Sequence, residues 1–127
     1  METLFLDTHI VVWLREKSLE KFSPKAIEAI ENSMQLLISP MVELELKYLF
    51  EIGKINDTPY NIIYELDAMI GLKIDTIDFS ELIKKSLLLE WTRDPFDRII
   101  VAHTMAKNIK LITKDERISA NFKDVLW

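Results

Sequence analysis

Short apolar runs of this chain alternate with longer segments in which apolar residues recur every three or four positions. The runs 3–6, 36–38 and 111–113 have the length of buried strands, and weaker strands are expected at 74–77, at a sheet edge, and at 125–127. The periodic segments predict helices over residues 8–17, 24–32, 40–53, 59–71, 78–91 and 95–107. Strands that alternate with helices in this way indicate a parallel sheet covered on both faces.

Helix boundaries are marked by residues that favour caps. Ser23-Pro24, Ser39-Pro40 and Asp94-Pro95 each place a capping side chain before a proline that suits the first helical position. Gly53 and Gly71 stand where two of the helices are expected to end. These signals fix the frame of the fold without a linker or repeat, so residues 1–127 are expected to form a single domain.

Composition restricts the class of protein. The 127 residues are 49% hydrophobic and 29% charged, as in an ordinary globular domain, and contain no cysteine for a disulfide or thiolate site. The first residues do not resemble an export signal, and no apolar stretch reaches the roughly 18 residues of a membrane span. We therefore expect a cytoplasmic protein without a membrane partner.

The net charge of −5 argues against a protein that binds nucleic acid by electrostatics alone, but not against a nuclease whose bound cations reverse the local field. The position of the acids therefore matters. Asp7 follows the first strand directly, and Asp115 comes two residues after the strand at 111–113. Parallel sheets bind ligands at the carboxyl ends of their strands, and Glu45 and Asp97 lie early in helices that begin near this rim.

Four grouped carboxylates are costly without a cation, because two unit charges about 4 Å apart repel by about 4 kcal/mol at an effective dielectric constant near 20. Their hard oxygen atoms suit Mg²⁺ or Mn²⁺ rather than zinc. Glu45 is preferred to Glu43 as a ligand because it shares a helix face with the apolar Leu49 and Ile52. Glu43 has the spacing of a solvated ion pair with Lys47, although a contribution of Glu43 to the site stays open.

Several segments together resemble one known family. The chain contains, in order, LFLDTH, the Glu45 helix running to Gly53-Lys54-Ile55, the segment RDPFDR at 93–98, and LITKD at 111–115. In this order and at this spacing, which covers nearly the whole chain, they resemble the PIN domain, in particular the VapC-like toxins of toxin–antitoxin pairs.

This resemblance implies an α/β fold, a three-layer α/β/α sandwich with a short, mostly parallel central sheet. It also implies an endoribonuclease that hydrolyses RNA phosphodiester bonds with water activated by one or two Mg²⁺ or Mn²⁺ ions, an antitoxin partner and a homodimer. The implied metal ligands and catalytic residues are Asp7, Glu45, Asp97 and Asp115. Supporting roles fall to Thr8, Thr113 and Asp94, although Asp94 fits a helix N-cap at least as well.

Other residues carry weaker expectations. Four basic residues beside these motifs could hold phosphate or form ordinary ion pairs such as Asp94–Arg98: Arg93, Arg98, Lys114 and Arg117. His9 and His103 are expected to pack in the core or behind the acids, and Trp13 in the core or an interface. A haloacid dehalogenase-type phosphatase is disfavoured because His9 stands where that chemistry needs a second aspartate. A catalytically silent PIN domain that serves as a binding module is the remaining alternative.

Overall fold

The computed structural model describes all residues 1–127 and is built around one parallel sheet of five strands in the order β3-β2-β1-β4-β5. The registers pair Phe5 with Leu37 on one side of the central strand and with Leu111 on the other. The strands are β1 (Thr3–Leu6), β2 (Gln35–Ile38), β3 (Lys73–Ile74), β4 (Lys110–Ile112) and β5 (Val125–Leu126).

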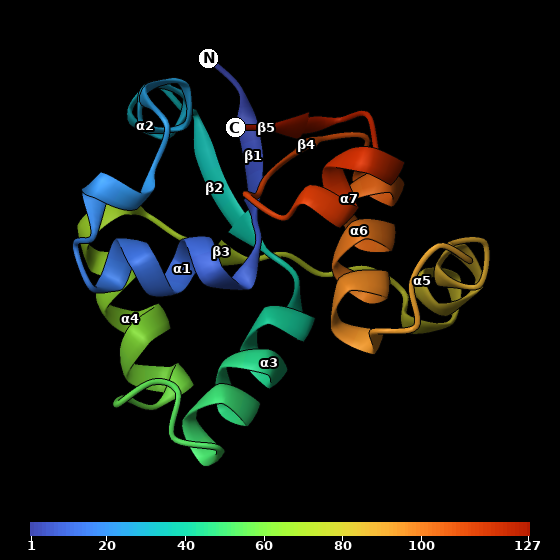
Figure 1. The fold of residues 1–127 in the computed structure, drawn as a ribbon, viewed down its shortest axis with the longest axis horizontal. Helices are drawn as coiled ribbons and strands as arrows, with labels where there is room; N and C mark the ends of the chain where they lie inside the picture. Colours follow the sequence, from blue (N-terminus) through green and yellow to red (C-terminus); the bar gives the residue numbers. More distant parts are fainter.

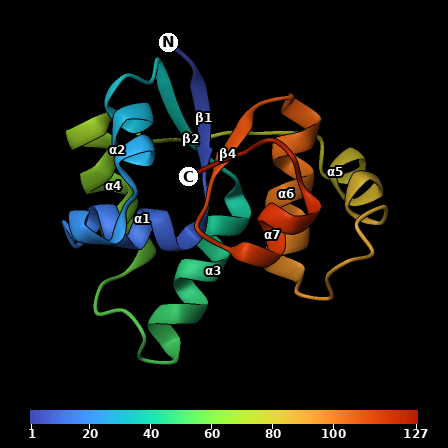
Figure 2. The same cartoon turned by 45° about the horizontal axis from the view of Figure 1, so that its top comes forward.

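Helices cover both faces of this sheet, which confirms the expected α/β/α sandwich (Figure 1). In both views α1, α2 and α4 lie on one side and α5, α6 and α7 on the other, while α3 lies beyond the carboxyl ends of the strands (Figure 2). The helices are α1 (Thr8–Arg15), α2 (Pro24–Glu31), α3 (Pro40–Glu51), α4 (Pro59–Ile70), α5 (Phe79–Ser86), α6 (Pro95–Lys107) and α7 (Glu116–Asn121).

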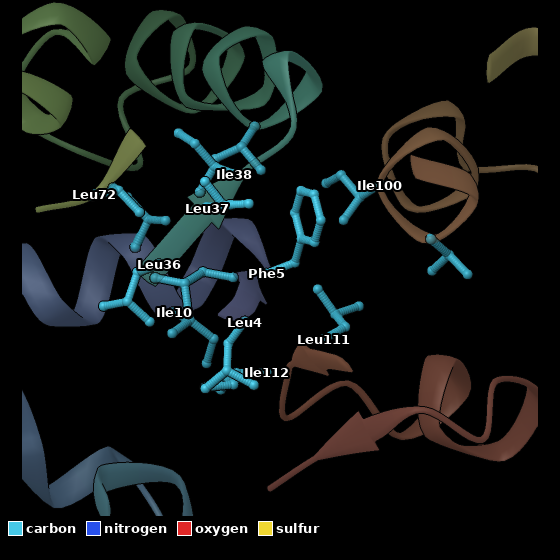
Figure 3. Packing of buried hydrophobic residues seen from close by; sticks show 14 of the residues in the cluster. Leu4, Phe5, Ile10, Leu36, Leu37, Ile38, Leu72, Ile100, Leu111 and Ile112 are labelled. Atoms are coloured by element: carbon cyan, nitrogen blue, oxygen red, sulfur yellow. The ribbon is translucent and has the colours of Figure 1, made fainter. Parts of the chain in front are cut away.

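The core lies on both faces of β1, whose residues Leu4, Phe5 and Leu6 are at most 1% exposed. Successive side chains of a strand point to opposite faces, and the Phe5 ring extends towards Ile100 of α6 (Figure 3). A central strand that is apolar on both faces is the expected pattern for a parallel sheet between two helical layers. The same burial fixes the point at which the first acid, Asp7, leaves the sheet.

The capping residues act as the sequence predicts. The side chains of Ser23 and Ser39 accept hydrogen bonds from backbone N–H groups in the first turns of α2 and α3. Gly71 ends α4 with a φ of 72°, and Gly53 follows α3 with a φ of 77°, a left-handed conformation that costs glycine little.

Two boundaries differ from the prediction. The edge strand is Lys73–Ile74 instead of 74–77. The Asp75 backbone N–H still donates to the Ile38 carbonyl at 2.9 Å, and pairing with β2 ends there, where the Asp75 side chain contacts His103 and Lys107 of α6. The helix predicted to reach residue 91 ends at Ser86. The chain beyond it is a loop whose Leu89 and Thr92 carbonyls accept hydrogen bonds from Arg98.

Two short elements were not predicted: the 3-10 helix Leu19–Lys21 and the helix α7. In α7 only Ile118 is buried, so the segment is too short to show helical periodicity in the sequence. No helix combines the length and the apolar character that crossing a membrane requires.

Candidate functional site: an acidic cluster at the carboxyl edge of the sheet

Strand order places two of the candidate acids side by side. From β1 the chain moves to β2 and β3 on one side, and later to β4 and β5 on the other, so the order reverses between β1 and β4. Open α/β sheets bind ligands in the crevice outside the strands at this point. Asp7 follows β1 there, with its backbone N–H donating to the Ile112 carbonyl at 3.1 Å, and Asp115 lies just beyond β4.

Asp7 is only 6% exposed, yet both of its carboxylate oxygens accept hydrogen bonds. The Thr8 backbone N–H donates to Oδ1 at 2.8 Å, and the Thr113 hydroxyl donates to Oδ2 at 2.6 Å. Burial raises the pKa of Asp7, and the two hydrogen bonds oppose that shift. Thr113 was expected to support the site, and in the structure its hydroxyl contacts Asp7 directly.

Glu45 approaches Asp7 from α3. The Thr8 hydroxyl donates a hydrogen bond to Glu45 Oε1, so the residue that follows the first acid also contacts the second. Burial raises the pKa of Glu45, the Thr8 hydrogen bond lowers it, and the charge of Asp7 raises it further. Glu43 makes none of these contacts, and its expected ion pair with Lys47 is not present; Lys47 Nζ instead lies 5.7 Å from the centre of the Phe50 ring.

Asp97 is the acid whose pKa is raised by the charges of all four other acids. Burial, followed by the charges of Asp94, Asp7, Asp115 and Glu45, raises the pKa of Asp97 to about 7. Asp94 caps α6, accepting hydrogen bonds from the backbone N–H groups of Phe96 at 2.8 Å and Asp97 at 3.3 Å. The alternative reading of Asp94 as an N-cap is therefore confirmed, while its charge still acts on the neighbouring acids.

Asp115 is tied to the same edge by its backbone and its side chain. Its N–H donates to Thr113 Oγ1 at 3.0 Å, and its carboxylate caps α7 by accepting from the Ile118 N–H at 2.9 Å. Thr113 thus connects Asp7 with Asp115 across β1 and β4. We refer to Asp7, Glu45, Asp94, Asp97 and Asp115 as the acidic cluster.

The donor chemistry of the acidic cluster fits a hard divalent cation, since it offers carboxylate oxygens and no sulfur. In the arrangement observed, no three acidic or histidine side chains are placed to hold one ion together. Glu45 accepts from Thr8 while Asp94 and Asp115 cap helices. Coordination of one ion by several of these carboxylates therefore requires a change in side-chain conformation.

The four basic candidates differ in what they contact. Arg98 binds backbone carbonyls of the preceding loop: its Nε donates to Leu89 at 3.1 Å, and its Nη2 donates to Thr92 at 2.7 Å. The Asp94–Arg98 ion pair does not form. Lys114 is exposed, with Nζ 5.9 Å from the centre of the Trp13 ring. The exposed side chains of Arg93 and Arg117 form no ion pair and remain candidates for phosphate.

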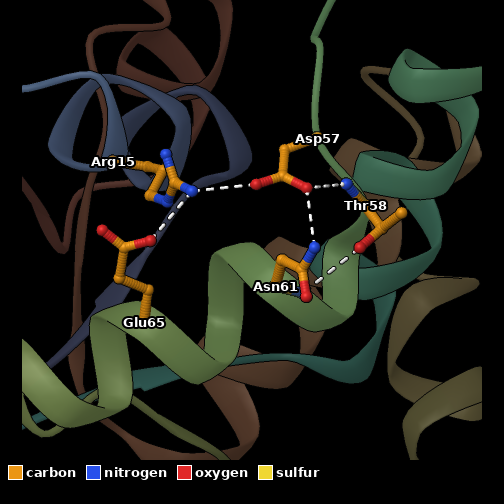
Figure 4. A network of polar contacts seen from close by, with 5 residues as sticks. All are labelled: Arg15, Asp57, Thr58, Asn61 and Glu65. Carbon is orange, nitrogen blue, oxygen red and sulfur yellow. Dashed lines mark hydrogen bonds and ion pairs between the residues drawn. The ribbon is translucent and has the colours of Figure 1, made fainter.

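A further arginine on α1 is also occupied. Arg15 forms ion pairs of 2.8 Å with Asp57, before α4, and with Glu65, on α4 (Figure 4). Asp57 also accepts from Asn61, so this network ties the end of α1 to the start of α4. Arg15 therefore stabilises the contact between α1 and α4.

The two histidines have different surroundings. His103 is buried as expected, with Nε2 3.0 Å from Asp75 Oδ2 and its ring against Phe5. Burial lowers the pKa of His103, and the contact with Asp75 opposes that shift. His9 was expected to pack in the core or behind the acids; the core placement is wrong, because His9 is exposed, and a positive charge at His9 lowers the pKa of Asp7 and of Glu45.

A cleft of about 300 Å³ opens directly beside the acidic cluster. No local sequence pattern predicts this cleft, because its lining joins the start of α1 to a segment about 105 residues further along the chain. Its lining residues come from α1 and from the β4–α7 segment: Asp7, His9, Ile10, Trp13, Thr113, Lys114, Asp115 and Glu116.

The sequence matches the model of one known protein family. The model of the PIN domain matches residues 4–123. The chain belongs to the PIN-domain family. The resemblance inferred from the four sequence segments is confirmed. A search of curated protein sequences finds no match to this PIN domain.

Solved structures with the same fold come from toxin–antitoxin complexes. A chain of VapBC2 from Rickettsia felis, solved with a promoter DNA fragment, shares 17% identity over 97% of this PIN domain and 95% of that chain, with a TM-score of 0.66. A chain of DNA-bound VapBC from Salmonella typhimurium shares 17% identity over 98% of this PIN domain and 96% of that chain, with a TM-score of 0.66. A chain of a toxin–antitoxin complex from Klebsiella pneumoniae shares 20% identity over 96% of this PIN domain and 94% of that chain, with a TM-score of 0.61. At these identities the likeness establishes the shared fold.

Proposed function

We propose that this PIN domain is the toxin of a toxin–antitoxin pair, an endoribonuclease that hydrolyses RNA phosphodiester bonds with the help of Mg²⁺ or Mn²⁺. The observation that carries the proposal is the acidic cluster, in which burial and the charges of acids from segments far apart in the sequence raise the pKa of Asp97 to about 7. Such crowding is unfavourable for folding and is relieved by a divalent cation. Perturbed carboxylates in a crevice are also typical of functional sites.

Asp7, Glu45, Asp97 and Asp115 would hold one or two ions. Bound there, a divalent ion lowers the pKa of a coordinated water and offsets the charge that develops on the phosphate. The chain's own contribution is to position its side chains. Thr113 and the Thr8 N–H orient the Asp7 carboxylate, the Thr8 hydroxyl holds Glu45 beside it, and Asp94 fixes the first turn of α6, which carries Asp97.

Asp7→Asn tests the site directly. The substitution keeps volume and removes a charge, so we expect the fold to persist and cleavage of single-stranded RNA to fall at least about 100-fold in Mg²⁺ or Mn²⁺. EDTA is expected to abolish cleavage by the wild type. Asp124→Asn, at the amino edge of the sheet, is the matched control and is expected to cut normally.

Absence of cleavage by the wild type over a broad set of RNAs, with either ion, would favour the silent binding module instead. Unchanged turnover in Asp7→Asn would contradict the proposed site.

An antitoxin partner and a homodimer form part of the same proposal. The solved structures with this fold reported above are toxin–antitoxin complexes, two of them VapBC, which supports an antitoxin partner. Large apolar side chains stay exposed on α3, α4, α5 and the loop that follows α5, including Tyr48, Tyr60, Tyr64, Phe79 and Leu88, and such surfaces are typical of protein interfaces. Light scattering of the purified chain, alone and with the product of a neighbouring short reading frame, measures both associations.

A further inference from the structure

The residues that line the cleft beside the acidic cluster differ in chemistry. Asp7, Thr113 and Asp115 belong to or support the proposed metal site, and Glu116 adds a further carboxylate. The remaining lining residues are Ile10 and the group that we call the aromatic wall, which consists of His9, Trp13 and Lys114. At about 300 Å³ the cleft lies at the lower end of the range of small-molecule pockets, about 300 to 1,000 Å³.

The aromatic wall is held in place from behind. The Trp13 ring packs edge-on against Phe22 at 6.0 Å and against Trp127 at 6.2 Å between ring centres. His9 lies 6.3 Å from Trp13 between ring centres and is exposed. The Trp13 ring is partly buried, and the ammonium groups of Lys21 and Lys114 lie 5.6 and 5.9 Å from its centre, so a flat ligand that stacks on this ring takes the place of a flexible lysine side chain.

Charge gives this wall a polarity. Lys114 Nζ lies 5.9 Å from the Trp13 ring and has no carboxylate partner within ion-pair distance. Lys114 is also the residue between Thr113 and Asp115, so its ammonium lies at the boundary between the aromatic wall and the acids. An aromatic surface next to an unpaired cation suits a ligand with a flat ring and a phosphate.

We propose that the cleft binds one unpaired nucleobase of the RNA substrate against His9 and Trp13, with Lys114 on the adjoining phosphate. Base stacking on aromatic side chains is the usual way in which proteins hold single-stranded RNA, and it tolerates any base. The inference rests on the proposed function and adds to it a binding subsite that sets where the strand lies relative to the acidic cluster. The proposal makes His9 and Lys114 substrate-positioning residues.

Nucleotide titration without metal tests the subsite separately from cleavage. The probes are uridine 5′-monophosphate and adenosine 5′-monophosphate, and ribose 5-phosphate is the compound that lacks a base. The readout is the indole N–H signal of Trp13 in ¹H–¹⁵N NMR spectra, assigned with Trp13→Phe, with the signal of Trp91 as internal control. We expect both nucleotides to shift the Trp13 signal saturably, and ribose 5-phosphate, which offers only a phosphate to Lys114, to shift it much less.

Two variants separate the parts of the subsite. His9→Ala removes an exposed ring and is expected to weaken nucleotide binding about 5-fold, the lower end of the loss for one base–aromatic stack. Lys114→Gln is expected to weaken binding of the two nucleotides. Binding of the nucleoside uridine, which carries no phosphate, is expected to stay unchanged. Lys123→Gln, an exposed lysine outside the cleft, is the control and is expected to bind like the wild type.

The outcomes distinguish this inference from the nuclease proposal. An equal response to ribose 5-phosphate and to the nucleotides, or unaltered nucleotide binding in His9→Ala, overturns the base subsite even if the wild type cuts RNA. A base-dependent response that His9→Ala weakens supports the subsite, and if the same protein cuts no RNA, the proposal of cleavage fails while the binding cleft stands.

Discussion

At the scale of single residues, the crowding of carboxylates makes the site a source of instability when no cation is bound. Burial, together with four neighbouring acids, raises the pKa of Asp97 from the model-compound value of 3.8 to about 7. Between these two values the native state holds a proton that the unfolded chain releases, so stability falls as the pH rises through this window. Above about pH 7 the full penalty remains.

Asp97→Asn removes that penalty. In EDTA at pH 8 we expect the variant to exceed the wild type in free energy of unfolding by about 1–3 kcal/mol, a value reduced from the full shift to allow for screening by water. At pH 5 the gain is expected to be less than half as large. Urea unfolding at both pH values measures it, and Asp124→Asn is the control. A gain that does not depend on pH would contradict the electrostatic explanation.

Glu45 and Glu43 provide a second comparison between single residues. Only Glu45 accepts a hydrogen bond from Thr8 and is influenced by the charge of Asp7. Glu45→Gln is therefore expected to reduce cleavage about 100-fold and Glu43→Gln less than about 3-fold, because only the first removes a charge from the proposed ion site. Single-turnover cleavage of one RNA measures both. The reverse order would exchange the roles of the two glutamates.

At the scale of elements, α6 depends on the loop in front of it. Arg98 reaches back from α6 to the carbonyls of Leu89 and Thr92, and so closes the loop that the sequence pattern had suggested as the end of α5. Arg98→Gln removes these charge-assisted hydrogen bonds, so we expect a loss of about 1–3 kcal/mol of stability. If Arg98 has no phosphate contact, the salt dependence of RNA binding stays unchanged.

Arg93→Gln is the matched comparison. Its side chain is exposed and forms no ion pair, so we expect stability within about 0.5 kcal/mol of the wild type. If Arg93 holds a phosphate, the slope of log affinity against log salt falls by about 1. Thermal unfolding and RNA binding at several salt concentrations measure both properties. A stable Arg98→Gln variant with a reduced slope would restore the phosphate role to Arg98.

Which elements the sequence predicts depends on how strongly each is buried. The three inner strands and the capped helices α2, α3, α4 and α6 show clear apolar patterns and cap residues, and their bounds agree with the prediction within a few residues. The edge strand β3, the end of α5 and the short α7 depend on tertiary contacts such as Asp75 with His103 and Arg98 with Leu89. These contacts join residues far apart in the chain and leave no local pattern.

The same distinction holds for the site. Asp7, Glu45 and Asp115 could be identified because each follows a strand or lies on an apolar helix face near one rim. The exposure of His9 could not, since it depends on which side of α1 meets the sheet at its first turn. The hydrogen bond from Thr8 to Glu45 likewise becomes visible only when α3 is in place.

At the scale of the whole molecule, the proposed ion connects parts of the chain that are far apart in the sequence and are otherwise joined by the core and by a few hydrogen bonds such as Thr113–Asp7 and Thr8–Glu45. Asp7 follows β1, Glu45 lies on α3, Asp97 begins α6 and Asp115 leads into α7. An ion bound by these residues stabilises the native state alone, since the unfolded chain holds the same acids far apart. Its stabilising effect should therefore depend on ion concentration by mass action.

This linkage fixes a prediction with a definite dependence on pH. At an ion concentration of about 100 times the dissociation constant, we expect Mg²⁺ or Mn²⁺ to add about 2.7 kcal/mol to the free energy of unfolding. The effect should be larger at pH 8 than at pH 6, because the ion competes with the proton that Asp97 retains below about pH 7. Asp7→Asn should lose most of the effect, whereas Asp124→Asn should keep it. Equal stabilisation of Asp7→Asn and the wild type, measured by urea unfolding in matched ionic strength, would place the ion elsewhere and remove the basis for a metal-dependent nuclease at this edge of the sheet.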